Sequence, residues 1–409
     1  MNGTNEINAR LLFYNLMALC FVFPIAPKLV PFFLVIISIV SLFNFKTELN
    51  KQFNYYKPFI LSISFYLISI LGLLWSSDIT SGIKHLEIKL SFLIIPLIFL
   101  NKNLISQLKI KYLFYSFLIG NCFAAIFALG NAALIYFQKG INHFTYTLLS
   151  PNFHPTYLSM YALFCLSLLL LSGNMLIKNK YLKNVLIVFL ILWTILLSSK
   201  INIAVLFIVL TFQLIHNLKA SQNKFKYLII SLLSLFCVAA FLYFNTSITE
   251  RFKAGFTAIS PSNNIVNSET ESNVARILIW KSASNLVIQH PLIGVGTGDV
   301  NNELVKEYEN RSYSGIKEKR LNAHNQYLQT ALSTGIPSAL LLLLFLIFPI
   351  LAFSSPKYRI LHYFIVIFCV NGLVESTLEN QAGVVFFMFF YFLLLRYTSN
   401  KIELNTIFK

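Results

Sequence analysis

Long apolar runs recur along almost the whole chain. A run of about 17 to 25 apolar residues is what a helix needs to cross roughly 30 Å of hydrocarbon. Lipid offers no hydrogen-bond partner to an open backbone, so such runs are expected to be membrane-spanning helices. The sequence predicts about twelve, near residues 11–27, 29–45, 58–75, 83–100, 112–137, 154–172, 182–198, 201–218, 227–244, 326–353, 359–374 and 381–397. The expected fold class is therefore an all-α polytopic membrane protein.

Charge supports this prediction and gives it a direction. Only 11% of the residues are charged, too few to cover a surface that faces water. With the N-terminus in the cytoplasm, most of the Lys and Arg residues fall in alternate loops on the inner side, as the positive-inside rule requires. The net charge of +17 thus reflects topology, with membrane lipids as partner rather than nucleic acid. The short outer loops hold only Lys28, Lys84, Lys89, Lys139 and Lys200.

The first run follows Arg10 without a small-x-small cleavage site, so we expect a retained helix rather than a removed signal peptide. Between the ninth and tenth runs lies a polar segment, residues 245–323, much longer than the other connections and therefore a candidate for function. The expected organisation is nine spans in 1–244, a large outer loop with short helices in 245–323, and three spans in 324–409. All five cysteines lie inside apolar runs without CxxC spacing, which disfavours a disulfide or zinc framework.

The outer loop contains a predicted amphipathic helix, NVARILIWKSASNLVIQ, residues 273–289. At about 100° per residue, Arg276 falls within the apolar face. That face also holds Ile279, Trp280, Ala283, Leu286 and Val287, and the opposite face holds Lys281, Ser282, Asn285 and Gln289. Two interpretations remain: Arg276 reaches lipid phosphates from a surface helix, or the helix packs on the membrane helices and Arg276 points into an anion site.

A glycine-rich turn, HPLIGVGTGDV, follows this helix. Pro291 ends the helix, and Gly294, Gly296 and Gly298 allow a close turn whose amides could surround an anion. Most glycine-rich turns only turn the chain, and this spacing is neither a Walker loop nor a dinucleotide motif.

The stretch RLNAHNQYLQTALSTG, residues 320–335, is polar at the entrance of the tenth run. Asn322 is a suitable N-cap, which would place His324 in the first helical turn, with Asn325 beside it. The positive end of the helix dipole favours neutral imidazole, which accepts protons. The alternative is a structural histidine that is hydrogen-bonded at a helix end.

Further polar groups are predicted on the same outer side. Lys200 follows Ser198 and Ser199 in a tight turn, His154 lies in SPNFHPTY at the start of the sixth run, and NGLVESTLENQAG places Asn371, Glu375 and Glu379 on one helical face. Ionisable residues at membrane depth are costly and are functional candidates. Together with Arg276, Arg320 and His324 they predict a polar outer cavity for a strongly anionic group.

In these motifs the chain resembles the bacterial O-antigen ligase and O-antigen polymerase family. The resemblance rests on Arg276 and Trp280 in R-x3-W, then HPLIGVGTG, then AHNQYLQTALSTGIPSALLLLL, and implies a ligase-type domain over about residues 195–350. It implies a metal-independent, inverting membrane glycosyltransferase without a cofactor, whose site faces the periplasm at the inner membrane. The implied donor is a glycan on undecaprenyl diphosphate, and the implied acceptor is a hydroxyl of lipid A core, in a ligase, or of another carrier-linked glycan, in a repeat-unit polymerase.

The resemblance also implies residue roles. His324 matches the family's essential histidine, and Arg276 matches the arginine that holds the diphosphate. Lys200 stands where the family has arginine, which keeps the charge but not the bidentate fork. Arg320 is expected to assist, and Asn325, His154, Glu375, Glu379, Gly294 and Gly296 are expected to line the pocket. A polysaccharide or lipid transporter is the competing function of another class, since twelve spans also suit it.

Overall fold

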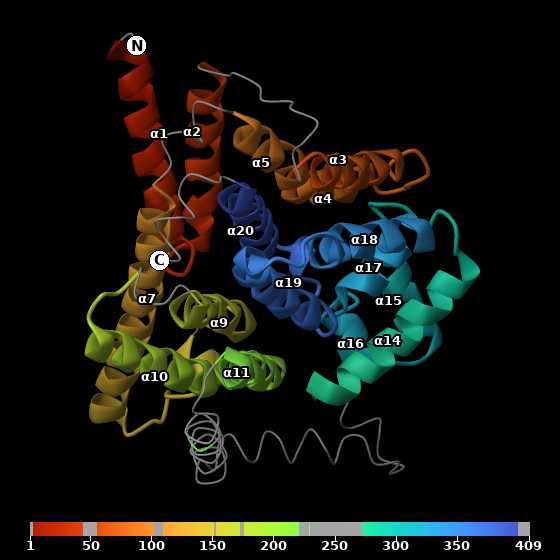
Figure 1. Ribbon diagram of the computed structural model, residues 1–409. Helices are drawn as coiled ribbons and strands as arrows, with labels where there is room; N and C mark the ends of the chain where they lie inside the picture. The colour runs from red at the N-terminus through yellow and green to blue at the C-terminus, as the bar shows by residue number, and fades with distance from the viewer. Residues whose placement is uncertain are drawn as a thin grey trace. The chain divides into compact units, whose positions relative to one another are not determined.

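The computed structural model describes residues 3–43, 55–101, 109–150, 153–171, 176–220, 229 and 272–399. Within these residues the regular structure is helical, without a β-strand, which confirms the all-α prediction (Figure 1). The predicted run 227–244, apart from Ile229, and the first part of the outer loop, residues 245–271, lie outside the described residues.

Two predicted runs are each divided between two helices. The run 83–100 is divided between α4 (Ile79–Lys89) and α5 (Ser91–Leu100), and the run 326–353 between α17 (Gln326–Thr334) and α18 (Ile336–Ala352). The second break lies at Gly335, whose φ of +87° no helical residue adopts. Pro337 then occupies the first turn of α18, a position where its missing N–H costs nothing.

The described residues cluster into two compact units. The first unit comprises residues 1–19, 27–110 and 258–409, and the second comprises 20–26 and 111–257. The first unit contains α4, α5, α17, α18 and most of α1 (Gly3–Val22), whose last residues belong to the second unit. It also contains η1 (Pro27–Leu29), α2 (Val30–Phe43), α3 (Tyr56–Leu71), α14 (Ser272–Gln289), α15 (Val300–Asn310), α16 (Ser314–Glu318), η3 (Pro356–Tyr358), α19 (Arg359–Gly372), η4 (Thr377–Glu379) and α20 (Gln381–Ser399).

Helix α20 forms the centre of the first unit. Every residue from 384 to 395 is at most 2% exposed, so the helix is enclosed on all sides, with α5 and α19 packed against it. Its sequence, VVFFMFFYFLLL, is apolar around the whole circumference, as expected of a helix with no solvent face. Phe345 of α18 and Phe92 of α5 join its ring cluster, at a centroid distance of 5.9 Å from one another.

Beside this bundle, α14 to α17 form a smaller layer with its own apolar core. The core is built on Ile279, Ala283, Leu304, Tyr308, Ile316 and Leu332, each at most 1% exposed. The layer packs on the bundle mainly through α17, which contacts α3, α18 and η4 (Figure 1). The second half of the predicted outer loop is therefore folded structure that is attached to the bundle.

The second unit contains α7 (Ile110–Lys139), α8 (Tyr146–Leu149), α9 (Pro155–Leu171), α10 (Lys180–Leu196) and α11 (Lys200–Ala220). Helix α9 is its core: all residues from 155 to 169 are buried, and α10 and α11 pack against it. Phe117 of α7 meets Tyr161 and Phe164 of α9 at centroid distances of 5.9 and 5.8 Å.

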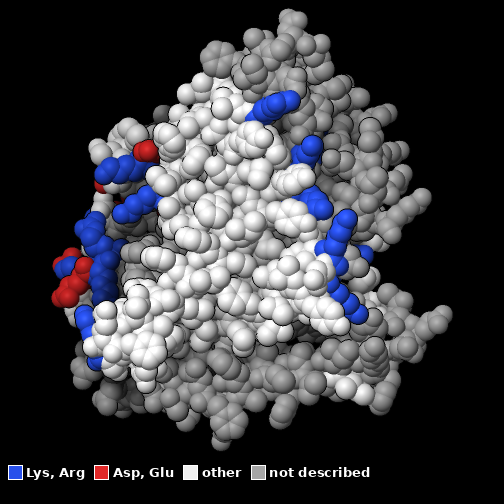
Figure 2. Space-filling view, turned by 90° about the vertical axis from the view of Figure 1, so that its left-hand side faces the viewer, with Lys and Arg blue, Asp and Glu red and all other residues white. Residues whose placement is uncertain are grey.

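By length and composition, α7 and α11 are suited to cross a membrane on their own, and the described residues include six shorter apolar helices. Helix α7 exposes large apolar side chains, among them Ile126 at 63%, Phe127 at 68% and Phe137 at 84%. Figure 2 shows the described Lys and Arg side chains in separate groups with wide uncharged surface between them. Exposed apolar surface of this extent suits lipid rather than water.

Candidate active site

Helix α14 carries Arg276 and Trp280 one turn apart. The face predicted to be apolar is packed inward, with Ile279 and Ala283 at 0% exposure, so the helix lies on protein. Ser282, predicted on the opposite, polar face, is also fully buried, because α14 is covered on more than one side. The Arg276 side chain keeps 25% exposure. The helix ends at Gln289, ahead of Pro291, as predicted.

His324 lies before α17 rather than in its first turn. The N-cap is Asn325, whose Oδ1 accepts hydrogen bonds from the amides of Tyr327 and Leu328. The Asn322 Oδ1 instead accepts a hydrogen bond from the amide of His324, at 3.0 Å. His324 itself adopts a φ of +43°. The predicted cap was therefore wrong by three residues, and the dipole argument for a first-turn histidine does not apply.

Asn325 has a second structural bond. Its Nδ2 donates to the carbonyl of Leu373 at 3.0 Å, which ties the His324 segment to the chain that follows α19. Both ends of the Asn325 amide group are thus occupied by protein. Its observed place is that of a helix cap and a tie, beside the site rather than in it.

Glu375 lies between Arg276 and His324. Its Oε2 is 3.7 Å from the Arg276 Nη2, and its Oε1 is 3.4 Å from the His324 Nδ1. All three side chains are largely buried, with exposures of 12% for Glu375, 24% for His324 and 25% for Arg276. The structure therefore brings three predicted site residues together, from α14, from the segment before α17 and from the turn after α19.

Two nitrogen atoms of this cluster have no hydrogen-bond partner among the described residues. They are the Arg276 Nε and the His324 Nδ1, and both are buried. A buried polar atom without a partner is costly, and a catalytic or binding role is one explanation for it in a native protein. The two atoms are therefore available to a substrate or to a closer contact with Glu375.

The indole of Trp280 joins α14 to the histidine segment. Its Nε1 donates to the carbonyl oxygen of His324 at 3.3 Å. The R-x3-W spacing puts Arg276 and Trp280 on neighbouring turns of the same helical face. The arginine thus contacts the carboxylate that faces the imidazole, while the tryptophan contacts the backbone of the same histidine.

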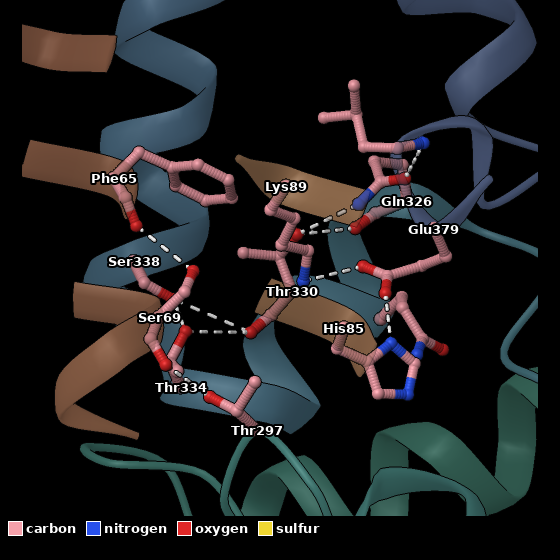
Figure 3. Close-up of polar contacts among 12 residues, drawn as sticks. Phe65, Ser69, His85, Lys89, Thr297, Gln326, Thr330, Thr334, Ser338 and Glu379 are labelled. Atoms are coloured by element: carbon pink, nitrogen blue, oxygen red, sulfur yellow. Dashed lines mark hydrogen bonds and ion pairs between the residues drawn. The ribbon is translucent and has the colours of Figure 1, made fainter. Parts of the chain in front are cut away.

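Glu375 and Glu379 do not share a helical face as predicted. Helix α19 ends at Gly372, and Glu379 follows in the 3-10 turn η4. The carboxylate of Glu379 points to α4, where Oε1 is 2.8 Å from the Lys89 Nζ and Oε2 is 3.0 Å from the His85 Nδ1 (Figure 3). The two glutamates therefore serve two separate clusters.

The Glu379 cluster is almost closed to solvent. The side chains of Lys89 and Glu379 are 3% and 6% exposed. Burial raises the pKa of the Glu379 carboxyl, but the Lys89 charge and the His85 hydrogen bond lower it by more, and the net pKa is about 2. Sequence reasoning assigned Lys89 only to topology and did not single out His85. Their i, i+4 spacing in KHLEIK was the available signal, since it places both on one helical face.

The amides of the glycine turn are already used by the protein. Val295 and Gly296 donate to the carbonyls of Leu332 and Ser333 at the end of α17, and Gly294 donates to His290. Gly294 and Gly296 have positive φ values of +68° and +108°. The turn therefore caps the C-terminal end of α17, and these amides are not free to surround an anion in this structure.

Arg320 has its hydrogen-bond partner outside the Arg276 cluster. Its Nη2 donates to the Asn302 Oδ1 at 2.9 Å, in a polar pocket of about 630 Å³ that is also lined by Asp78, Asp299 and Glu303. The Asp299 carboxylate accepts the amides of Ser77 and Asp78 at 2.6 and 2.8 Å, ahead of α4. The predicted cavity is thus at least two polar sites in the first unit.

Lys200 and His154 lie in the second unit, at the same end of the α9 and α11 pair. Lys200 begins α11, directly after the buried Ser199, and the exposed His154 precedes α9. Thr156 and Ser199, one from each helix start, approach to 3.4 Å, and Asn202 donates to the Thr156 carbonyl at 3.0 Å.

A sequence relationship covers α11 and α14 to α17, but not α4, α9, α19 or η4. The family model described as O-antigen ligase matches residues 184–343. This segment is similar to the O-antigen ligase family. The family resemblance stated from the motifs is thereby confirmed. The matched residues include Lys200, Arg276, Trp280 and His324, whereas Glu375 and Glu379 lie beyond them.

The O-antigen ligase relationship supports an enzyme of the ligase or polymerase type, associated with the membrane and with surface polysaccharide synthesis. No curated protein that was compared matches the sequence.

Proposed function

We propose that this protein transfers a glycan from undecaprenyl diphosphate to a hydroxyl of lipid A core, as an O-antigen ligase does, at the periplasmic face of the inner membrane. The observation that carries the proposal is the placement of Glu375 between Arg276 and His324, the cation and the imidazole of the family motifs. A base that is oriented by a carboxylate, next to a cation, suits the transfer of a group from an anionic leaving group to a hydroxyl.

In this mechanism His324 is the general base. The His324 Nδ1 faces the Glu375 carboxylate at 3.4 Å, which leaves Nε2 to accept the proton of the acceptor hydroxyl. A carboxylate on the far nitrogen fixes the ring orientation and stabilises the imidazolium that forms. Contacts of this kind are often long without substrate and shorten in the complex.

Arg276 holds the leaving diphosphate. Its guanidinium keeps a buried Nε without a hydrogen-bond partner and meets Glu375 only at 3.7 Å, so it has donors for phosphate oxygens. Lys200 belongs to the second unit, and a role for it on the diphosphate stays a prediction from its place in the family motif. Arg320 is left out of the diphosphate site because it binds Asn302.

The reaction is a direct displacement with inversion. The acceptor oxygen forms a bond to the anomeric carbon as the bond from that carbon to the diphosphate oxygen breaks. The hydroxyl proton passes to His324, and undecaprenyl diphosphate leaves with the electron pair of the broken bond. No nucleotide is needed because the diphosphate ester supplies the driving force.

The proposal includes a membrane topology of twelve spans with the active site on the outer side. Twelve spans with a cytoplasmic N-terminus place the start of α17, the turn after α19 and the start of α4 on the outer side. The positive-inside distribution of Lys and Arg supports this orientation. Labelling of single cysteines introduced at exposed sites such as Lys281 and Lys319, with a reagent that does not cross the membrane, tests it.

The decisive experiment is glycan transfer by the purified chain in detergent, from a carrier-linked donor to lipid A core. We expect His324→Ala to lose at least about 10²-fold in kcat, the usual contribution of a general base. Transfer by His324→Ala at the wild-type rate would falsify the assignment. In a deletion strain, loss of all long glycan from lipid A, with carrier-linked chains accumulating, indicates a ligase. A single repeat unit still attached indicates a polymerase, and movement of labelled glycan without a new glycosidic bond indicates a transporter.

A further inference from the structure

The buried cluster of Glu379, Lys89 and His85 has no part in the mechanism above, yet it is costly. Lys89 and Glu379 are 3% and 6% exposed, and His85 is 17% exposed. Apolar side chains of similar size in such places are often as stable as the ion pair or more so. A buried charge cluster is therefore weak evidence for stability, and its placement has to be explained by what it holds.

The cluster holds the turn that carries Glu375. Glu379 is four residues after Glu375, and the chain between them is rigid, since Ser376, Thr377 and Leu378 are at most 2% exposed. The Glu379 amide also donates to the Ser376 carbonyl at 3.1 Å, which closes the 3-10 turn. If the Glu379 carboxylate moves, the short turn between the two residues is therefore expected to move Glu375 with it.

The same turn is fastened to the histidine segment on both sides of Glu375. Before it, the Leu373 carbonyl accepts the Asn325 side chain at 3.0 Å. After it, the Leu378 amide donates to the Gln326 Oε1 at 2.7 Å, and Gln326 is 1% exposed (Figure 3). Two hydrogen bonds thus join the Glu375 turn to the His324 segment, and Glu379 connects this turn to α4.

Helix α4, in turn, is fixed to the chain that follows Arg276's helix. The Asp299 carboxylate, at the end of the glycine turn, accepts the two amides that precede α4. Asp78 caps α4 through the Ser81 amide at 2.9 Å. Helix α4 therefore connects to the loop after α14 at its start, and to the Glu375 turn through His85 and Lys89.

From these contacts we infer that Glu379, held by Lys89 and His85, is a positioning residue that sets the place of Glu375 between Arg276 and His324. This inference rests on the proposed function. Glu379 contacts no reacting group, so it acts through Glu375. A displacement of about 1 Å in a catalytic group costs roughly 10²-fold in rate, and this sets the size of the effect.

The test compares the Glu379→Gln chain with the wild type in the same transfer assay. Removal of the charge from Glu379 loosens the connection of the turn to Lys89 and His85. We therefore expect kcat to fall by about 10- to 100-fold while the donor KM stays within about threefold. Glu309→Gln is the matched control, because it removes a carboxylate that pairs with Lys317 on the surface, at 63% exposure. Equal losses in both variants would contradict the inference, and so would a kcat of Glu379→Gln within threefold of the wild type.

Two further variants separate positioning from folding. In the Glu375→Gln background, Glu379→Gln is expected to add no further loss, since residues that act through one another are not additive. An equal fractional loss in both backgrounds overturns the inference. The double variant Lys89→Met with Glu379→Leu replaces the ion pair by apolar side chains. We expect its unfolding temperature to equal that of the wild type while its kcat stays low. Recovery of kcat there shows that the charges are not needed.

The outcomes of this test and of the His324 test are distinct. Full activity of His324→Ala would refute the proposed mechanism, whatever the activity of the Glu379→Gln variant. An inactive His324→Ala together with an active Glu379→Gln removes only the positioning role.

Discussion

The Glu375→Gln variant removes one negative charge from the space between Arg276 and His324 while it keeps the shape of the side chain. In the proposed mechanism the imidazole becomes positively charged as it takes the acceptor proton, and the Glu375 carboxylate stabilises that charge from 3.4 Å. At this distance, with an effective dielectric constant of about 20, the attraction is about 5 kcal/mol.

Partial exposure of both side chains reduces this value. His324 is 24% exposed and Glu375 12%, so water screens part of the interaction. If about half remains, the transition state loses roughly 2.5 kcal/mol, which is close to 10²-fold in rate. The unscreened value corresponds to more than about 10³-fold. We therefore expect kcat to fall by between about 10² and 10³-fold.

The assay is transfer of carrier-linked glycan by the purified variant, followed from about pH 5 to 9. Because Glu375 acts on the charged form of His324, the loss is expected mainly in kcat, with the donor KM changed little. Arg276→Lys is the complementary variant, since it keeps the charge but loses the planar fork and should raise the donor KM. A kcat of Glu375→Gln within fivefold of the wild type would refute the base and carboxylate pair.

Three further predictions concern stability, each measured by thermal unfolding in detergent. Asn325→Ala should cost about 1 kcal/mol through loss of the α17 cap, whereas Asn325→Ser keeps a capping oxygen and should cost less. Gly335→Ala should cost about 2 kcal/mol or more, because φ is +87° and the added Cβ would lie 2.1 Å from the Leu292 carbonyl oxygen. Gly130→Ala, inside α7 with nothing within 4 Å of the added Cβ, is its control and should not lower stability. The Glu379 pKa of about 2 lies below the ordinary 4.5, so its stabilisation is present above pH 4.5 and is lost as pH falls toward 2; the stability gap between wild type and Glu379→Gln should close over that window.

Sequence patterns predicted most of the helices but not their ends. The apolar runs near 112–137, 154–172 and 381–397 coincide with α7, α9 and α20. The run 326–353 looked continuous, because apolar residues do not show a break in the backbone. The signal was Gly335 followed by Pro337 in STGIPS, which permits a positive φ and then a new helix start.

The sequence predicted which residues belong to the candidate site, but not which of them contact one another. NAHNQ contains two asparagines that could cap a helix, and the structure shows that Asn325 does, because its Oδ1 accepts the amides of Tyr327 and Leu328. Lys89 and Glu379 are joined across almost three hundred residues of sequence, so no local pattern links them. The periodicity argument for Glu375 and Glu379 failed because α19 stops at Gly372, and the two carboxylates then face different helices.

Helix α14 fixes the separation between the cation and the base. Arg276 contacts the carboxylate that faces His324, and Trp280 holds the His324 backbone, so both contacts depend on a spacing of four residues along one helix. Insertion of one residue between them would turn the indole by about 100° relative to the guanidinium. The site geometry therefore constrains the number of residues between Arg276 and Trp280 as well as the two side chains themselves.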